Sequence, residues 1–564
     1  MSGMPNEPVS LILHGGHVRT MDGAGTVASA MAVAGDRVVG LGPDREVLAL
    51  RGPRTRVIEL RGRSVVPGFT DAHSHPLSAG LRHVECSLDR FFTEPELVAT
   101  VAAYAAAHPE REWILGDGWS METFPGGIPR REPLDAVVRD RPVFLYNRDG
   151  HGAWVNTRAL ELAGITSETP DPPNGRIERD PDGTPVGMLQ EAATGLVERL
   201  VPLYDAATLE QALLAAQGEL HALGIVGWQD ANVRPSALAA HRAVAGRGAL
   251  TARVVLAMGS HDLDAYGGFD GMASIRDAVA ADAAAAAAPP GRPGSARLSA
   301  GSVKFFVDGV LENRTGALLT PYLDPDGRPT GGTGISNREP AELNRLAVEL
   351  DRRGFQLHYH AIGDRAVREA LDAIEAARNA NGVRDGRHHI AHIQLIHPDD
   401  VPRFAALDAV ANAQPLWAVH EAQMDTLTIP LLGPERTAWQ YPFGSLLRAG
   451  ARLAFGSDWA VSTPDPFPQM EVAVNRVWPG HRDGVPFLPS ERLTLDQALR
   501  AATVGSAFVN RQDEAGWLAV GRLADLAVLD RELGAPAGPI GDTKVVATMV
   551  GGDFEFEAPA LEAG

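Results

Sequence analysis

An apolar run that ends at two histidines constrains the fold of this chain more than any other feature. Val65-Val66-Pro67-Gly68-Phe69 is followed by Thr-Asp-Ala and then by His73-Ser74-His75. Successive side chains of a strand point to opposite faces, so His73 and His75 point the same way. Two imidazoles on one side of a strand end can share a divalent metal if other segments supply further ligands. Alone, the pair also fits two surface histidines in a turn.

Four further candidate ligands each follow a short apolar run of strand type and precede loop or helix-start residues. They are Lys304, His360, His392 and Asp458. In a parallel barrel the C-terminal ends of all strands open onto one face, and functional groups gather there. We therefore expect five separate segments to converge on one site.

These segments belong to a set of short motifs that spans nearly the whole chain. They are Pro-Gly-Phe-Thr-Asp-Ala-His-Ser-His at 67–75, Asp-Gly-His-Gly-Ala-Trp-Val-Asn at 149–156, Lys-Phe-Phe-Val-Asp-Gly at 304–309, His-Ala-Ile-Gly-Asp at 360–364, Ala-His-Ile-Gln at 391–394 and Gly-Ser-Asp at 456–458. With them the chain resembles the amidohydrolase superfamily, and within it the YtcJ-like branch, which includes N-substituted formamide deformylases. The motif at 149–156 is peculiar to that branch. The resemblance implies a metal-dependent α/β hydrolase on a distorted TIM (β/α)8 barrel with a small β-sandwich domain.

Both chain ends read as short strands broken by turns, and the family joins its two ends in one β-sandwich. We therefore expect residues 1–66 and 511–564 to form the β-sandwich domain and residues 67–510 to form the barrel. The 564 residues are enough for a barrel with insertions and a satellite domain.

A long insertion follows the first barrel strand. The second strand is expected near 224–230, after a helix near 207–223, which leaves 83–200 as the insertion or lid. A connection much longer than an ordinary βα loop usually forms a lid or binding element. Its aromatic residues, Trp154 among them, could line an apolar pocket, although the insertion's own core is the simpler interpretation for any one of them.

Composition excludes several classes of partner. The chain has 51 basic and 71 acidic residues and a formal net charge of -20, which argues against nucleic acid because phosphates require a basic surface. The single Cys86 excludes an intrachain disulfide framework and a cysteine-based metal site. Because the N-terminus lacks a signal-peptide pattern and no apolar run reaches membrane-spanning length, we expect a cytoplasmic protein without a membrane partner. The branch suggests a homodimer.

The resemblance also implies how the metals are held. His73, His75 and Asp458 would bind the more buried metal, and His360 and His392 would bind a second one. Zinc is expected at both positions, although manganese, iron and cobalt suit the same ligands.

Lys304 is the unusual member of this set, because an ammonium group has no lone pair and repels cations. Binuclear amidohydrolases commonly convert such a lysine with carbon dioxide into a carbamate, an anionic donor that bridges the two metals. We expect the same of Lys304. The alternative is an ammonium group paired with Asp308 or another acid beside a single metal.

The expected reaction is hydrolysis of a non-peptide carbon–nitrogen bond by metal-bound hydroxide, with an N-substituted formamide or another N-acyl amine as substrate. Asp458 would take a proton from the nucleophile and pass it to the leaving nitrogen, and His392 is the second residue assigned to catalysis. The same site would serve a cyclic amide, a carbamate or an ester. A binding or regulatory protein without turnover is the alternative of another class, although all six ligand positions hold competent residue types.

Three residues are candidates for substrate contact: His151, Trp154 and Gln394. His151 lies in the branch-specific motif and could reach the substrate carbonyl, or it could cap its own loop. Gln394 could orient the substrate, although polar residues at strand ends often bond only their own loop.

Overall fold

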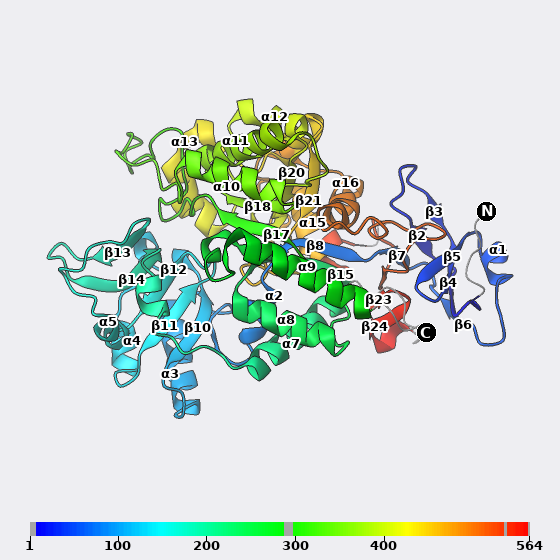
Figure 1. Cartoon of the computed structure of the whole chain (residues 1–564), viewed down its shortest axis with the longest axis horizontal. Helices are drawn as coiled ribbons and strands as arrows, with labels where there is room; N and C mark the ends of the chain where they lie inside the picture. Colours follow the sequence, from blue (N-terminus) through cyan, green and yellow to red (C-terminus); the bar gives the residue numbers. More distant parts are fainter. Residues whose placement is uncertain (1–6, 287–296, 535–537, 562–564) are drawn as a thin grey trace.

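The computed structural model describes residues 7–286, 297–534 and 538–561 and arranges them in three parts (Figure 1). A barrel lies in the middle. The insertion, coloured cyan, lies on one side of it, and strands from both chain ends, coloured blue and red, lie on the opposite side.

The described residues form a barrel of eight parallel strands that neighbour one another in chain order. The strands are β8 (Phe69–Ser74), β15 (Ile225–Val233), β16 (Arg253–Gly259), β17 (Leu298–Phe306), β18 (Gln356–Ala361), β19 (His389–His392), β20 (Val410–Ala413) and β21 (Arg452–Phe455). Strand β21 meets β8 at the seam, where the Asp458 backbone N–H donates to the His73 carbonyl at 2.8 Å. The predicted TIM-type barrel is confirmed, and it is nearly closed.

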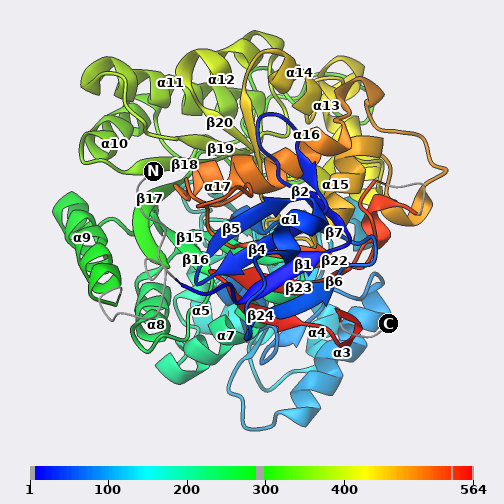
Figure 2. The same cartoon turned by 90° about the vertical axis from the view of Figure 1, so that its right-hand side faces the viewer.

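Helices cover the outside of the barrel, and in Figure 2 they lie around the terminal sheets that face the viewer. They are α2 (Pro76–Leu81), α7 (Ala206–Ala222), α8 (Pro235–Gly246), α9 (Gly268–Ala286), α10 (Pro340–Arg352), α11 (Asp364–Asn381), α12 (Val401–Leu407), α13 (Ile429–Thr437), α14 (Phe443–Arg448), α15 (Pro466–Asn475), α16 (Leu495–Arg500) and α17 (Ser506–Val509). The short helix α6 (Gly195–Glu198) belongs to the insertion and packs there through Val197. Helix α11 shows the pattern, because its buried Ala366, Ala370 and Ile374 recur every four residues and face the core.

Strands from the two chain ends join in one sheet. Strand β7 (Ser64–Pro67) pairs antiparallel with β22 (Leu526–Leu529), which connects the N-terminal and C-terminal segments. This sheet has the order β24-β23-β22-β7-β2-β3, and a second sheet has the order β5-β4-β1-β6. The remaining elements are β1 (Leu11–His14), β2 (His17–Arg19), β3 (Val27–Ala28), β4 (Ala30–Ala34), β5 (Arg37–Gly42), α1 (Asp44–Leu48), β6 (Arg56–Glu59), β23 (Val545–Val550) and β24 (Asp553–Glu557).

Apolar side chains from both terminal sheets pack into one cluster, which includes Leu13, Val33, Val65 and Val528. Each chain end therefore buries a strand face that it could not bury alone. The predicted limits at 66/67 and 510/511 stay predictions, because strand pairing defines sheets and not domain edges.

The insertion folds around a sheet of its own, with the order β13-β14-β12-β11-β10-β9. Its elements are β9 (Cys86–Ser87), α3 (Glu94–Ala107), β10 (Ile114–Trp119), α4 (Glu132–Val137), β11 (Val143–Asn147), β12 (Gly152–Val155), α5 (Thr157–Ala163), β13 (Gly175–Arg179) and β14 (Pro185–Glu191). One apolar cluster, which includes Trp119, Phe124 and Trp154, packs the insertion against barrel loops. A second cluster, which includes Phe144 and Leu160, lies within the insertion alone. The insertion is thus a folded unit with a core.

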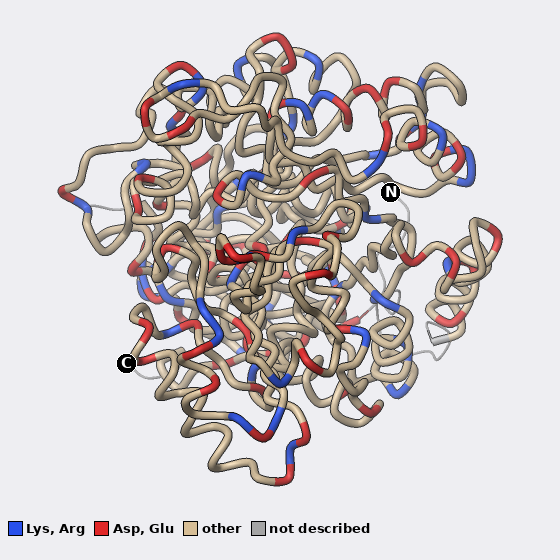
Figure 3. The backbone as a smooth tube through the Cα atoms, turned by 90° about the vertical axis from the view of Figure 1, so that its left-hand side faces the viewer, with Lys and Arg blue, Asp and Glu red and all other residues tan. Residues whose placement is uncertain are grey.

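Acidic and basic residues are interspersed along the backbone on the side of the insertion, as Figure 3 shows. Among the helices of the described residues, none is both long enough and apolar enough to cross a membrane.

A buried ion pair ties the barrel to the terminal sheets. Arg253 at the start of β16 donates from Nε and Nη2 to the two carboxylate oxygens of Asp525, at 2.6 and 3.0 Å. The side chains are 9% and 1% exposed. The backbone N–H of Gly551 also donates to Asp525, so the carboxylate is surrounded by donors.

Replacing Arg253 with methionine should lower the free energy of unfolding by about 3–5 kcal/mol, because Asp525 would stay buried without its counter-ion. Urea denaturation followed by circular dichroism measures this. The matched control is Arg328→Met, since Arg328 pairs with Asp326 on the surface, where the two side chains are 75% and 69% exposed. This substitution should lower the free energy of unfolding by less than about 1 kcal/mol. Equal losses in the two variants would contradict a structural role for the buried pair.

Candidate active site

A cavity of about 1520 Å³ opens at the C-terminal ends of the barrel strands. Its wall includes all six predicted ligands, His73, His75, Lys304, His360, His392 and Asp458, together with residues of the insertion. The convergence expected from the strand-end motifs is therefore present in the fold.

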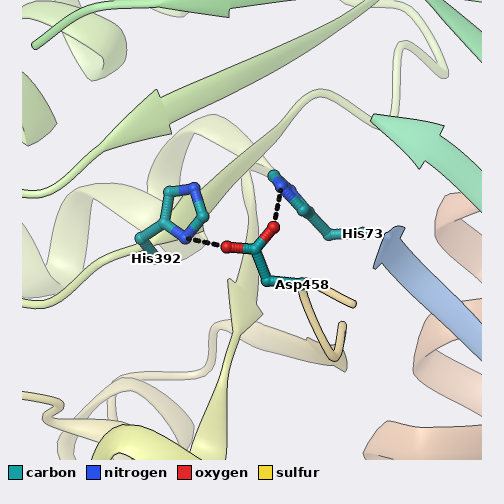
Figure 4. Close-up of side chains that lie close together, drawn as sticks. All are labelled: His73, His392 and Asp458. Atoms are coloured by element: carbon teal, nitrogen blue, oxygen red, sulfur yellow. Dashed lines mark ion pairs between the residues drawn. The ribbon is translucent and has the colours of Figure 1, made fainter. Parts of the chain in front are cut away.

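The Asp458 carboxylate lies between histidines from two other strands (Figure 4). Its Oδ1 is 3.2 Å from Nε2 of His73 and 3.2 Å from Nε2 of His75. Its Oδ2 is 4.0 Å from Nδ1 of His392. Three atoms that could bind a metal, one each from His73, His392 and Asp458, lie within 4.8 Å of one another. This spacing suits a single metal ion.

Two atoms of this group are buried without a hydrogen-bond partner among the residues that the structure describes, Asp458 Oδ1 and His392 Nδ1. A buried polar atom without a partner is costly and rare in a folded protein. Burial lowers the pKa of His73 to about 3, with a further contribution from the Lys304 ammonium. Burial raises the pKa of Asp458, but the facing His73 outweighs burial and holds that pKa well below its usual value. Neutral imidazoles and an ionised carboxylate are the forms that ligate a metal.

The backbone at two of these residues is unusual. His392 and Asp458 have φ angles of 74° and 54°, in the left-handed region that side chains other than glycine rarely adopt. The His392 backbone N–H is held by the Gln414 amide oxygen at 2.7 Å, and Asp458 is held by its bond to the His73 carbonyl. Such conformations cluster at functional sites, where the surrounding structure enforces them.

Lys304 is fully buried at the end of β17, with its Nζ 3.4 Å from His73 Nε2 and 5.0 Å from the Phe306 ring centre. Burial lowers the pKa of its amine to about 7. In ranges 7–286, 297–534 and 538–561 no carboxylate forms an ion pair with it. Asp308 instead accepts backbone N–H bonds from Ala317, Ile362 and Gly363. Among the described residues, the salt bridge considered as the alternative is therefore not formed.

His358 contacts His73 at the ring nitrogen that does not face Asp458. The ring nitrogens His358 Nε2 and His73 Nδ1 are 2.8 Å apart. When the His73 Nε2 lone pair faces the centre, Nδ1 carries the proton and donates it to His358. Such partners fix the tautomer and the ring orientation of a metal ligand.

His360 and His151 occupy the side of the cavity next to the insertion. The His360 ring is 4.4 Å from the His392 ring and 5.0 Å from the His151 ring. His151 Nδ1 is 2.9 Å from Glu191 Oε2. Burial would lower the pKa of His151, but the Glu191 carboxylate outweighs it and raises that pKa to about 9. The insertion thus presents a cationic hydrogen-bond donor to the cavity.

The two other substrate-contact candidates lie in different environments. Gln394 lines the cavity, and its amide N–H donates to Gln440 at 3.1 Å. Trp154 is fully buried between Trp119 and Phe124, and its indole N–H donates to the Arg130 carbonyl at 2.8 Å. The structure places Trp154 in the core of the insertion and outside the cavity wall.

Several cavity residues were not found from the sequence: Glu191, Glu312, Glu421 and Tyr441. Glu191 ends the buried strand β14, so a polar residue at a strand end was an available signal. The other three lie in loops, where no periodicity marks the direction of a side chain.

Comparisons with known proteins agree with the fold and the motifs. A family model described as "Amidohydrolase family" matches residues 56–554. Protein LONG AFTER FAR-RED 3 of Arabidopsis thaliana is 30% identical over 96% of this chain and 91% of its own. N-substituted formamide deformylase of Arthrobacter pascens is 29% identical over 97% of this chain and 98% of its own. The crystal structure of an uncharacterized metal-dependent hydrolase from Pyrococcus furiosus superposes with a TM-score of 0.68 at 26% identity, covering 92% of this chain and 99% of that one.

Replacing His358 with phenylalanine should weaken the affinity for a divalent metal about ten- to hundredfold, because His73 would lose the partner that orients its ring. Competition with a chromophoric chelator measures that affinity. His221→Phe is the control, since His221 is equally buried but bonds to Ile225 and Thr251. Unchanged affinity in the His358 variant would refute the supporting role.

Proposed function

The chain belongs to the amidohydrolase family, and on that premise we propose that it is a metal-dependent hydrolase of a non-peptide carbon–nitrogen bond. The observation that carries this proposal is the buried donor set around Asp458, in which one ligand atom each of His73, His392 and Asp458 lies within 4.8 Å of the others, and two of these residues keep a buried atom without a hydrogen-bond partner among the described residues. Such a donor set is costly unless a cation satisfies it.

We propose that the donor set holds two divalent metals. His73, His75 and Asp458 would hold one, and His360 and His392 would hold the other. Lys304 would lie between them as a carbamate, because a buried amine whose pKa is lowered to about 7 is often in the neutral form that reacts with carbon dioxide. When bound, the metals would supply the Lewis acidity that activates water and polarises the substrate carbonyl.

The residues of the chain would divide the remaining work. Asp458 would accept a proton from the attacking water through Oδ1 and deliver it to the leaving nitrogen. His392 would be held in place by Trp417, whose ring stacks on it at 5.6 Å and shields it from water. His151, held as a cation by Glu191, would donate a hydrogen bond to the substrate oxygen as negative charge develops there.

An N-substituted formamide or another N-acyl amine is the substrate class that we propose. The relative from Arthrobacter pascens carries that activity in its name and matches nearly the whole chain. The cavity exceeds the range of about 300–1,000 Å³ that is usual for small-molecule sites, so a large N-substituent would fit beside the acyl group. A cyclic amide, a carbamate or an ester would use the same residues, and product analysis separates these cases. The cytoplasmic location and the homodimer stay predictions.

Protein loaded with zinc or manganese should release a free amine from N-alkylformamides, as a fluorogenic amine reagent detects. Asp458→Asn should retain most of its metal, because an amide oxygen still ligates, yet lose activity by about 10²–10⁴-fold, because it cannot accept the proton. A variant with near-normal turnover would remove Asp458 from proton transfer. If the wild type binds metal and releases no amine from any acyl substrate, the proposed reaction fails.

Metal analysis after expression with zinc and bicarbonate should give two metals per chain, and Lys304→Ala should give one or fewer because the bridging ligand is lost. Plasma emission spectrometry measures the ratio. One metal in the wild type would contradict the carbamate bridge. No metal after reconstitution, with unchanged stability, would favour a binding protein without turnover.

A further inference from the structure

The cavity holds a second cluster of charged groups that the metal chemistry does not use. Glu312 lies in the loop after β17, Glu421 lies in the loop after β20, and Tyr441 lies between α13 and α14. All three line the cavity. They come from loops at the same end of the barrel as the metal ligands.

The carboxylates of this cluster outnumber the cations near them. The electrostatic partners of Glu421 are Arg148, Glu122, Glu312 and Asp425. Arg148 is the one cation in this set, and its Nη2 is already 3.5 Å from Glu122. Asp425 pairs with His420 at 2.7 Å, and Glu312 accepts a hydrogen bond from the Thr428 hydroxyl at 2.6 Å. Glu312 and Glu421 are therefore left with an excess of negative charge.

Among the described residues, the Glu421 carboxylate and the Tyr441 hydroxyl form no side-chain hydrogen bond. In the part of the chain that the structure describes, no hydrogen bond or ion pair reaches the Glu421 carboxylate. Burial raises the pKa of that carboxyl to about 7, and Arg148 offsets this effect only in part.

Tyr441 is only 2% exposed, and its hydroxyl likewise has no hydrogen-bond partner within the described residues. Burial raises the pKa of Tyr441 well above its usual value, and the Glu312 and Glu421 carboxylates add to this effect, while Arg476 opposes it. Because the residue is buried while it lines the cavity, its phenol oxygen is available to accept a hydrogen bond from a group bound there.

The cluster adjoins the catalytic centre. The Tyr441 backbone N–H donates to the carbonyl of Gln394, two residues after His392, at 2.8 Å. Trp417, which stacks on His392, precedes Glu421 by four residues. A substrate held at the metal ligands by its acyl group could therefore extend toward Glu312, Glu421 and Tyr441.

We propose that Glu312, Glu421 and Tyr441 form a cation subsite that binds a primary ammonium group at the far end of the substrate's amine portion. Two carboxylates and a phenol oxygen offer three acceptors to the three N–H donors of an ammonium group. The inference rests on the proposed function and narrows its substrate to the N-acyl derivative of a diamine. The cavity wall favours a cation over an anion, because it has eleven Asp and Glu side chains against four Lys and Arg.

The test compares two substrates of equal length, N-formyl-1,4-diaminobutane and N-pentylformamide, which differ by a terminal ammonium in place of a methyl group. The metal-loaded wild type should prefer the charged substrate in kcat/KM by about ten- to hundredfold, chiefly through KM. Glu421→Gln and Glu312→Gln should each remove most of that preference, and Tyr441→Phe should reduce it. Glu198→Gln is the control, since Glu198 lines the cavity but already pairs with Arg234 at 2.7 Å, and it should keep the preference.

Calorimetry with 1,4-diaminobutane, and with pentan-1-ol as the uncharged probe, measures binding without turnover. The diamine should bind the wild type and bind Glu421→Gln about tenfold more weakly.

If the wild type hydrolyses both substrates equally well, the subsite is overturned and the proposed function stands. If nothing is hydrolysed but diamine binding is lost in the Glu421 and Glu312 variants, the subsite stands and the proposed reaction fails. Equal diamine binding by wild type and variants overturns the subsite.

Discussion

The position of Asp458 is the constraint on which the rest of the structure depends. Its backbone N–H bonds to the His73 carbonyl and brings the last barrel strand to the first, while its carboxylate lies between His73, His75 and His392. The residue that closes the barrel therefore also brings the donor set together. Because the lone pairs that meet there are buried and partly unpartnered, the folded chain carries a cost that a bound cation would remove.

Buried polar residues around this centre keep it in place. Asp71 accepts from the backbone N–H groups of His73 and Ser457, and so holds both sides of the barrel seam. Asp308 likewise accepts hydrogen bonds from backbone N–H groups in the loops after β17 and β18, and so holds these loops together. Networks of this kind are stabilising only when every member is satisfied. Their satisfaction explains how the backbone can hold His392 and Asp458 in left-handed conformations.

The insertion and the barrel loops supply the walls of the cavity, and the two sides differ in chemistry. The insertion contributes His151 with its partner Glu191, close to His360. The loops that carry Glu312, Glu421 and Tyr441 contribute acidic and phenolic groups farther along the cavity wall. Loops tolerate sequence change better than strands do, so relatives that share the metal ligands could differ in this wall and hence in substrate. The molecule therefore separates the residues proposed for bond cleavage from those proposed for recognition.

The candidate ligands at strand ends could be predicted from local sequence. A period of two residues decides that His73 and His75 point the same way, and apolar runs mark the strand ends that carry the other four candidates, Lys304, His360, His392 and Asp458. The motifs also predicted the barrel and the superfamily, which the strand order and the family match confirm. Only the tertiary structure decided that Trp154 is buried in the insertion while Glu191, Glu421 and Tyr441 face the cavity. The physical reason is that a strand's periodicity decides which side chains share a face but not what that face packs against, as at Trp154 and Glu191, whereas the direction of a loop side chain follows from packing between segments far apart in the sequence.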